Sequence, residues 1–271
     1  MNETESYPVK HKPIVLAQIT DSHLFSSLDG LHHGHNVFDN LRNVLLSVRN
    51  NAQIDYVVFT GDLTQDHTEQ SYQNFVDCVH ECDITVPIYY LAGNHDEPEL
   101  LAKYFSVSPF LAGKEISLSH WQVQLVDSKS ATPAGYVSEP VLEKLQSAIM
   151  PGKHQLLMMH HHPIDVGYFI DKHGLQNKAD FWQAINGYNN IKAIACGHVH
   201  SAMELTNPVS NLLSKPLNQK LKEPVVLYTC PATSIQFDPN VDGVAALAKG
   251  PGYRVFYLYA DGQLNTDVVT L

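Results

Sequence analysis

The chain of 271 residues lacks several patterns that mark whole classes of protein. Its four cysteines show no Cys-x-x-Cys spacing, which excludes a zinc or dithiol site built on that motif. No apolar run approaches the roughly 18–20 residues that span a bilayer. The N-terminal residues are polar and acidic, without the basic start and apolar centre of a signal peptide. We therefore expect a cytoplasmic protein with no membrane partner.

Positive charge is also scarce. The chain has 17 Lys and Arg against 28 Asp and Glu, a formal net charge of −11, and no basic run. Nucleic-acid phosphates are contacted chiefly by Lys and Arg, so we do not expect a nucleic-acid polymer as partner. A small anionic substrate fits this charge if bound cations supply the local positive field. With 44% apolar residues the chain can bury a large core, and we assign 1–271 to a single domain.

What the sequence does contain is a series of short apolar runs, each followed by side chains with oxygen or nitrogen donors. The runs cover residues 13–20, 54–60, 86–92, 155–159 and 191–196. They lead, in order, into Asp21-Ser22-His23, Gly61-Asp62, Gly93-Asn94-His95-Asp96, His160-His161-His162-Pro163 and Gly197-His198-Val199-His200. Such runs suit strands covered on both faces, and the C-terminal ends of these strands line the ligand crevice of α/β sheets.

Asp62 is the candidate centre of a two-metal site. Gly61 lets the backbone turn sharply after the strand, and a carboxylate there can bridge two cations about 3.5–4 Å apart. A lone Gly-Asp pair usually marks only a turn, but five such endings in one chain favour metal binding. Asp, Asn and His donors suit Mn, Fe, Zn or Co.

The paired donors leave one alternative open. If the backbone is extended, Asp21 and His23 point to the same side and can chelate one ion. His198 and His200 either repeat that geometry or, in a tight turn, reach different ions.

Five motifs follow one another along the chain: Asp-x-His, Gly-Asp-x-x-x-Asp, Gly-Asn-His-Asp, His-His-Pro and Gly-His-x-His. This order resembles that of the calcineurin-like metallophosphoesterase superfamily. Within the superfamily, the chain is most similar to the class III cyclic nucleotide phosphodiesterases. The similarity lies in the triple histidine and in segments 18–25, 60–66, 231–237 and 250–254. The resemblance spans nearly the whole chain. It implies an α/β fold, a β-sandwich of two mixed sheets flanked by helices in four αββα layers.

The resemblance also implies a ligand set. One metal is expected between Asp21, His23, Asp62 and His200, and the other between Asp62, Asn94, His160 and His198. Matching the triple histidine without a gap through to Gly167 selects His160, while counting back from Pro163 selects His161; we prefer His160. The expected substrate contacts are His23, Asp62, Asn94, His95, His160, His200 and, from a Gly-x-Asn match, Asn36.

The implied activity is hydrolysis of 3′,5′-cyclic AMP to 5′-AMP by a hydroxide that bridges two divalent ions. Fe²⁺/Fe³⁺ or Mn²⁺ is expected, with Zn²⁺ or Co²⁺ as alternatives. Asn94 and His95 are the expected catalytic residues: His95 protonates the leaving oxygen, with Asp96 or another acid orienting its ring. Alternatively, His95 only braces its loop. Asp66 is expected to be structural.

Other functions remain in competition. One is a broader phosphodiesterase acting on 2′,3′-cyclic nucleotides or glycerophosphodiesters, because the metal core alone does not choose among substrates. Another is a metal-dependent nucleotide-binding regulator without turnover. We expect a monomer or homodimer.

The remaining pattern alternates helices and strands. Apolar spacing predicts helices over 37–48, 67–81, 97–105, 140–150 and 178–185. Late strands are expected over 225–229, 253–259 and 265–269, the last two as a hairpin. Residues 121–126 alternate like a strand with one polar face. Loops are expected over 24–36, with His32, His33 and His35 either near substrate or exposed, over 166–174, and as an insertion near 202–224.

Overall fold

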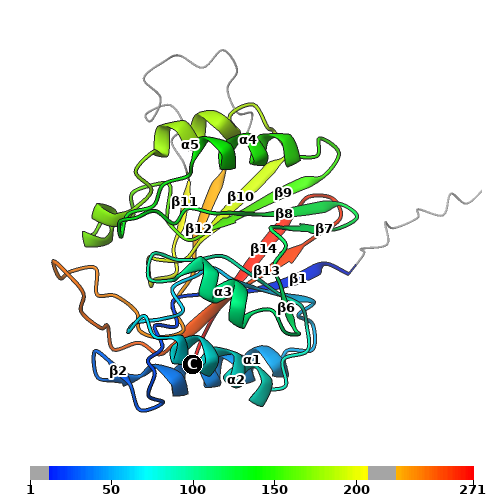
Figure 1. Ribbon diagram of the computed structural model, residues 1–271. Helices are drawn as coiled ribbons and strands as arrows, with labels where there is room; N and C mark the ends of the chain where they lie inside the picture. The colour runs from blue at the N-terminus through cyan, green and yellow to red at the C-terminus, as the bar shows by residue number, and fades with distance from the viewer. Residues whose placement is uncertain (1–11, 207–223) are drawn as a thin grey trace, which may run out of the picture.

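The computed structural model describes residues 12–206 and 224–271. Two six-stranded sheets lie face to face, with helices on both outer sides (Figure 1). The strand order is β14-β13-β1-β4-β5-β6 in the first sheet and β11-β12-β10-β9-β8-β7 in the second. Both sheets combine parallel and antiparallel pairs. The predicted αββα sandwich of two mixed sheets is confirmed.

The first sheet consists of β1 (Ile14–Ile19), β4 (Tyr56–Phe59), β5 (Ile88–Tyr90), β6 (Phe110–Leu111), β13 (Gly252–Leu258) and β14 (Leu264–Thr270). The second consists of β7 (Glu115–Ser117), β8 (Trp121–Val126), β9 (His154–Met159), β10 (Ile191–Cys196), β11 (Glu204–Thr206) and β12 (Val226–Thr229). A small hairpin is formed by β2 (Leu31–His32) and β3 (His35–Asn36).

The helices are α1 (Val37–Asn50), α2 (Glu69–Glu81), α3 (Pro98–Tyr104), α4 (Glu139–Ala148) and α5 (Lys178–Ile185), with a 3₁₀ turn η1 (Phe169–His173). Figure 1 shows α1, α2 and α3 against the first sheet and α4 and α5 over the second. All five predicted helices are present. Two begin at side-chain caps: Asn36 accepts from the Asp39 amide and Thr68 from the Ser71 amide.

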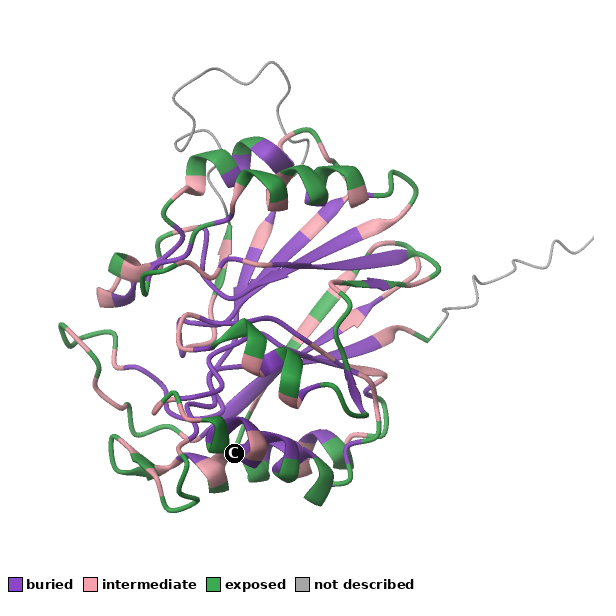
Figure 2. Ribbon diagram, viewed as in Figure 1, coloured by how far each residue is buried: buried purple, intermediate pink, exposed green. Residues whose placement is uncertain are grey.

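Three apolar layers hold the sandwich together. In β1, Val15, Ala17 and Ile19 pack with the helices, whereas Leu16 packs between the two sheets. A third layer joins the second sheet to α4 and α5. Burial on both faces explains why these strands appear as continuous apolar runs rather than alternating ones (Figure 2).

The parallel strands determine where a site can form. In the first sheet β1, β4, β5 and β6 are parallel, and in the second β8, β9, β10 and β12 are parallel. The loops after β1, β4, β5, β9 and β10 carry every candidate metal ligand. The carboxyl ends of these five strands meet at one end of the sandwich, as expected for a ligand crevice.

Some predictions need correction. The strand predicted over residues 121–126 is present as β8, and the glutamines of its polar face, Gln122 and Gln124, are both buried. The Gln122 amide donates to the Ala148 carbonyl and accepts from the Met150 amide, so a polar residue is satisfied inside the fold. The short strands β6, β7 and β11 were not predicted, and the loops over 24–36 and 166–174 contain β2, β3 and η1.

Most of the insertion near 202–224 lies outside the described residues; its first part contributes β11, paired with β12. The single-domain assignment stays a prediction. The four cysteines are free and buried. None of the helices within 12–206 and 224–271 is long and apolar enough to cross a membrane.

Candidate metal centre

Seven side chains from both sheets converge at the carboxyl ends of five strands. Asp21 and His23 follow β1, Asp62 follows β4, Asn94 follows β5, His160 follows β9, and His198 and His200 follow β10. Asn94 is half-buried, and the exposed fraction of each of the others is 5% or less. The structure therefore brings together all seven predicted ligands, although their role in metal binding stays a prediction.

The first group of donors is formed by Asp21, His23 and His200. The Nε2 atom of His200 lies 3.3 Å from Oδ1 of Asp21 and 3.1 Å from Nε2 of His23. The Nε2 atom of His23 lies 4.0 Å from the same Asp21 oxygen. These separations suit three donors around one ion at about 2.0–2.2 Å from each.

The second group is formed by Asp62, Asn94, His160 and His198. The Nε2 atom of His160 lies 3.3 Å from Oδ2 of Asp62, 3.2 Å from Oδ1 of Asn94 and 3.2 Å from Nδ1 of His198. The ligand set expected around the second ion is thus arranged around a single imidazole nitrogen.

Asp62 lies between the two groups. Its Oδ2 is 3.8 Å from Nε2 of His23 and 3.3 Å from Nε2 of His160, so one oxygen faces both sets of donors. Its Oδ1 accepts a 2.8 Å hydrogen bond from the His95 amide, which fixes the carboxylate plane. This is the position that a bridging carboxylate requires.

The histidine hydrogen bonds test whether these residues fit metal ions. Nδ1 of His23 faces the Gln65 amide oxygen, Nδ1 of His160 the Thr60 carbonyl, and Nδ1 of His200 the Ile235 carbonyl. Oxygens of this kind only accept, so each Nδ1 holds a ring proton and each Nε2 faces the centre. Second contacts of this type fix the tautomer of metal-ligating histidines. The His and Asp groups therefore suit a dinuclear metal site.

Electrostatics supports the same conclusion. Burial raises the pKa of the Asp62 carboxyl. The positive charge of His160 and a hydrogen bond to it have the opposite and larger effect, so the pKa lies well below its usual range. Burial lowers the pKa values of His23 and His198, so both rings are neutral donors. Burial also lowers the pKa of His160, but Asp62 outweighs it and raises this pKa to about 9. Metal binding at His160 therefore releases a proton.

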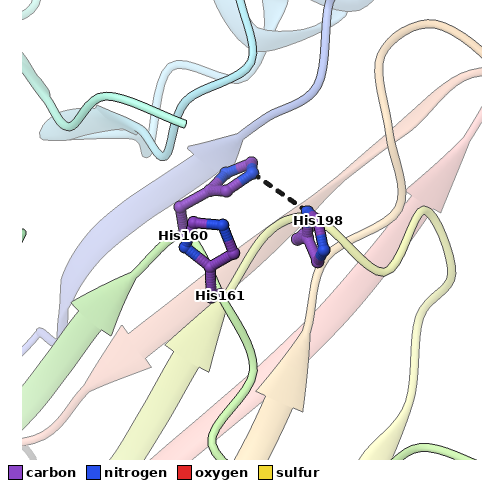
Figure 3. Close-up of side chains that lie close together, drawn as sticks. All are labelled: His160, His161 and His198. Carbon is purple, nitrogen blue, oxygen red and sulfur yellow. Dashed lines mark hydrogen bonds between the residues drawn. The ribbon is translucent and has the colours of Figure 1, made fainter. Parts of the chain in front are cut away.

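Hydrogen bonding distinguishes the members of the triple histidine. Both ring nitrogens of His161 have protein partners: its Nδ1 contacts the Ser128 hydroxyl at 2.8 Å, and its Nε2 faces the Pro133 carbonyl at 3.2 Å. Figure 3 shows the contact that joins His160, not His161, to His198. Although donor atoms of all three histidines lie within 4.8 Å of one another, the geometry favours His160 as the ligand.

Replacing His160 by alanine is expected to remove about one bound ion per chain and to lower kcat by about 10²-fold or more, because metal affinity already falls 10–100-fold when only supporting contacts are lost. His161→Ala should keep the two-ion stoichiometry. Metal content after loading with Mn²⁺ and desalting, measured by mass spectrometry, compares the two variants. The reverse pattern would assign the ligand to His161.

The backbone at five of the seven donors is left-handed, not extended. The residues with this conformation are Asp21 (φ 55°), His23 (46°), Asp62 (57°), His198 (67°) and His200 (49°). The extended condition for the Asp21-x-His23 pair is therefore not met, although both side chains still lie in one group of donors. After the strands end, the tips of β1 and β4 stay joined, because the Asp21 amide donates to Gly61 and the His23 amide to Asp62. Non-glycine residues held in this region are a mark of functional sites.

Two glycines allow the loops to approach. A Cβ on Gly61 would lie 2.3 Å from the Gly93 nitrogen, and a Cβ on Gly93 would lie 2.2 Å from Oδ1 of Asp62. Any side chain at Gly93 would displace the carboxylate between the two groups.

Of the expected orienting groups for the His95 ring, Asp96 or another acid, Asp96 is not bonded to the ring. Its carboxylate is buried and accepts from the amides of Asp62, Leu63 and Gly93, each at 2.8 Å. Burial and the nearby charge of Asp62 raise its pKa to about 6. Asp96 therefore fixes the loops that carry the donors.

Other predicted residues have structural contacts. Asn36 caps α1 and donates to the Leu28 carbonyl, so both ends of its amide are engaged; its substrate role stays a prediction. Asp66 accepts from the Ser26 and Thr68 amides, in agreement with a structural role.

Sequence reasoning missed two contacts to His23. Gln65 holds its Nδ1, and His32 stacks on its ring with centroids 5.2 Å apart and planes 4° apart. Burial lowers the pKa of His32 to about 4. The only signal for His32 was its place in the histidine-rich loop after β1. Phe237 stacks on the His200 ring, with ring centroids 3.8 Å apart.

Comparisons with known proteins identify the family to which this fold and site correspond. The family model for calcineurin-like phosphoesterases matches residues 14–202. A probable cyclic nucleotide phosphodiesterase from Colwellia psychrerythraea is 75% identical over 271 residues, covering 100% of both chains. The 3′,5′-cyclic adenosine monophosphate phosphodiesterase CpdA from Vibrio vulnificus is 31% identical over 277 residues, covering 100% of this chain and 95% of that relative.

A solved structure supports the fold. A dimetal phosphatase from Danio rerio superposes with a TM-score of 0.66 at 14% identity, covering 96% of this chain and 99% of the other. The family match over most of the chain and the full-length relative agree with the αββα sandwich. This chain belongs to the calcineurin-like phosphoesterase family.

Proposed function

We propose that this protein is a metal-dependent phosphodiesterase that hydrolyses 3′,5′-cyclic AMP to 5′-AMP. The observation that carries the proposal is the position of Asp62, whose Oδ2 faces donors of both groups. The names of the relatives, a probable cyclic nucleotide phosphodiesterase and a 3′,5′-cyclic adenosine monophosphate phosphodiesterase, support this substrate class.

The proposed roles follow from charge and geometry. When bound, two divalent cations neutralise the phosphoryl oxygens and lower the pKa of a bound water toward about 7. Asp21, His23 and His200 would hold one cation and Asn94, His160 and His198 the other, with Asp62 facing both groups. The expected substrate contacts at His23, Asp62, Asn94, His160 and His200 would be made through these cations. Nucleophilic oxygen adds to phosphorus in line with the 3′-oxygen, and the P–O3′ bond breaks.

His95 supplies the proton for the leaving 3′-oxygen in this scheme. Its backbone amide is fixed on Asp62, and its ring contacts His23 at right angles with centroids 4.9 Å apart. Its Nδ1 is buried and has no hydrogen-bond partner among the described residues. The half-buried ring lies beside the metal donors, and its Nδ1 has no protein hydrogen-bond partner within 12–206 and 224–271, which supports the proposed role of general acid.

The proposed metals are two ions, Fe²⁺/Fe³⁺ or Mn²⁺, with Zn²⁺ or Co²⁺ as alternatives, because sites of mixed imidazole and oxygen donors accept all of these. The proposed partner is the small cyclic nucleotide alone, with the chain in the cytoplasm as monomer or homodimer. The net charge of −11 argues against polymeric nucleic acid.

The substrate assignment is tested by turnover of cyclic AMP, cyclic GMP, 2′,3′-cyclic AMP and glycerophosphocholine with defined Mn²⁺ or Fe²⁺ loading. We expect kcat/KM to be highest for a 3′,5′-cyclic nucleotide, and chelation followed by desalting to remove activity that the metal then restores. Preference for either of the last two substrates would replace the proposal by a broader phosphodiesterase.

A non-catalytic regulator is a weaker candidate. A binding protein without turnover would be expected to lose a metal donor or the proton donor, yet all seven donors and His95 are present. Binding of cyclic AMP without product formation by the metal-loaded protein would favour the regulator.

A further inference from the structure

The ring of His95 needs a support that the loop itself does not supply. Its neighbour Asp96 is committed to three backbone amides. The contact with His23 is an edge contact, at an interplanar angle of 83°. A proton donor has to be held within a fraction of an ångström of its working position, because misplacement by about 1 Å can cost 10²-fold in rate.

His67 provides a second contact to this ring. The two imidazoles are parallel, with an interplanar angle of 2° and centroids 5.5 Å apart. Nδ1–H of His67 also donates to the backbone oxygen of His95 at 3.0 Å. The His67 side chain thus contacts both the ring and the main chain of His95, the proposed proton donor. If the loop around His95 shifts, the hydrogen bond moves the His67 ring with it.

The backbone at His67 is built to hold that position. Its φ is 55°, in the left-handed region, although it is neither a glycine nor one of the seven donors. Its amide donates to Oγ1 of Thr64 at 2.9 Å. The flanking Asp66 carboxylate accepts from both the amide and the hydroxyl of Thr68, which begins α2. Strained backbone fixed from both sides indicates a side chain that has to point one way.

A neighbouring contact separates ring support from loop support. Nζ of Lys129 donates to the backbone oxygen of Asn94 at 3.0 Å, one residue before the carbonyl that His67 holds. No ring contact joins Lys129 to His95 in the described part of the chain. Both side chains therefore brace the same loop, but only His67 contacts the imidazole.

We propose that His67 is the positioning residue of the proton donor, holding the His95 imidazole in the orientation that delivers its proton to the leaving 3′-oxygen. The inference rests on the proposed phosphodiester hydrolysis. His67 itself touches no reacting atom. In the step that it assists, the P–O3′ bond breaks and the proton moves from His95 to O3′.

The test compares two leaving groups. Cyclic AMP releases an alkoxide that needs a proton, whereas bis(p-nitrophenyl) phosphate releases a phenolate that departs without one. His67→Ala is expected to lower kcat for cyclic AMP by about tenfold or more, a part of the 10²–10⁴-fold that a general acid supplies, and to change kcat for the aryl diester by less than about twofold. His67→Phe, which keeps a ring against His95, should recover most of the loss.

Lys129→Met is the matched control, because it removes a donor from the adjacent carbonyl of the same loop. We expect its effect on the two activities to be equal and less than about twofold, because it leaves the His95 ring contact in place. Equal losses on both substrates in His67→Ala, or no recovery in His67→Phe, would overturn the positioning role. If the unsubstituted protein hydrolyses neither diester with Mn²⁺ or Fe²⁺ bound, the proposed function fails instead, and the two failures are distinguishable.

Discussion

Asp62→Asn is expected to lower kcat for cyclic AMP by about 10³-fold or more and to reduce the metal content below two ions per chain. The substitution keeps Oδ1, which accepts the His95 amide, so the loop contact is retained. It removes the negative charge of the oxygen that faces His23 and His160. Loss of the shared anionic donor weakens both ions at once, and a two-metal reaction depends on both.

The measurement combines steady-state kinetics with metal analysis of the desalted protein. Asp127→Asn is the matched control: Asp127 also follows a strand of the sandwich, but its carboxylate forms a half-exposed ion pair with Lys114. That variant should keep its metal and its kcat within about twofold, since exposed pairs contribute little. Full metal occupancy and full activity in Asp62→Asn would contradict the bridging role.

His95→Phe is expected to lower kcat for cyclic AMP by about 10²–10⁴-fold and to spare the aryl diester. Phenylalanine keeps a ring between His23 and His67 but has no proton to give. The backbone bond from residue 95 to Asp62 does not depend on the side chain, so metal content should stay at two ions.

Parallel assays of cyclic AMP and bis(p-nitrophenyl) phosphate, with metal analysis of each preparation, check this expectation. Equal losses on both substrates would show that His95 only braces its loop, the alternative that the sequence left open. Loss of metal would show instead that the ring supports the donor group around His23.

The layout of the candidate site was largely predictable from sequence because chain position alone carries the information. Apolar runs that stop at Asp21, Asp62 or His160 mark strand ends, and parallel strands bring their ends to one edge. Periodic apolar spacing likewise located all five helices within two residues of their ends. Burial on both faces made β1 and β4 visible as continuous runs.

What could not be predicted depends on contacts between distant segments. The sequence predicted a polar face for β8 but not its burial, because tertiary hydrogen bonds satisfy Gln122 in the interior. The strands β6, β7 and β11 have only two or three residues each, too few for an alternation to register.

The contacts around His95 were hidden for the same reason. An adjacent Asp96 looked like its partner, but the left-handed turns around Asp62 bring three amides to that carboxylate instead. His67 lies 28 residues before His95 and reaches it only because β4 and β5 are neighbours. No local pattern encodes a pairing of that kind.

The left-handed backbone at the five donors links catalysis to thermostability. Each such residue costs roughly 1–2 kcal/mol relative to glycine, which adopts this conformation freely but offers no side chain. Glycine at these positions would relieve that backbone cost but would remove the side chains on which activity depends. This trade-off is confined to the tips of β1, β4 and β10, so engineering for robustness has to work on surface helices and loops remote from those tips.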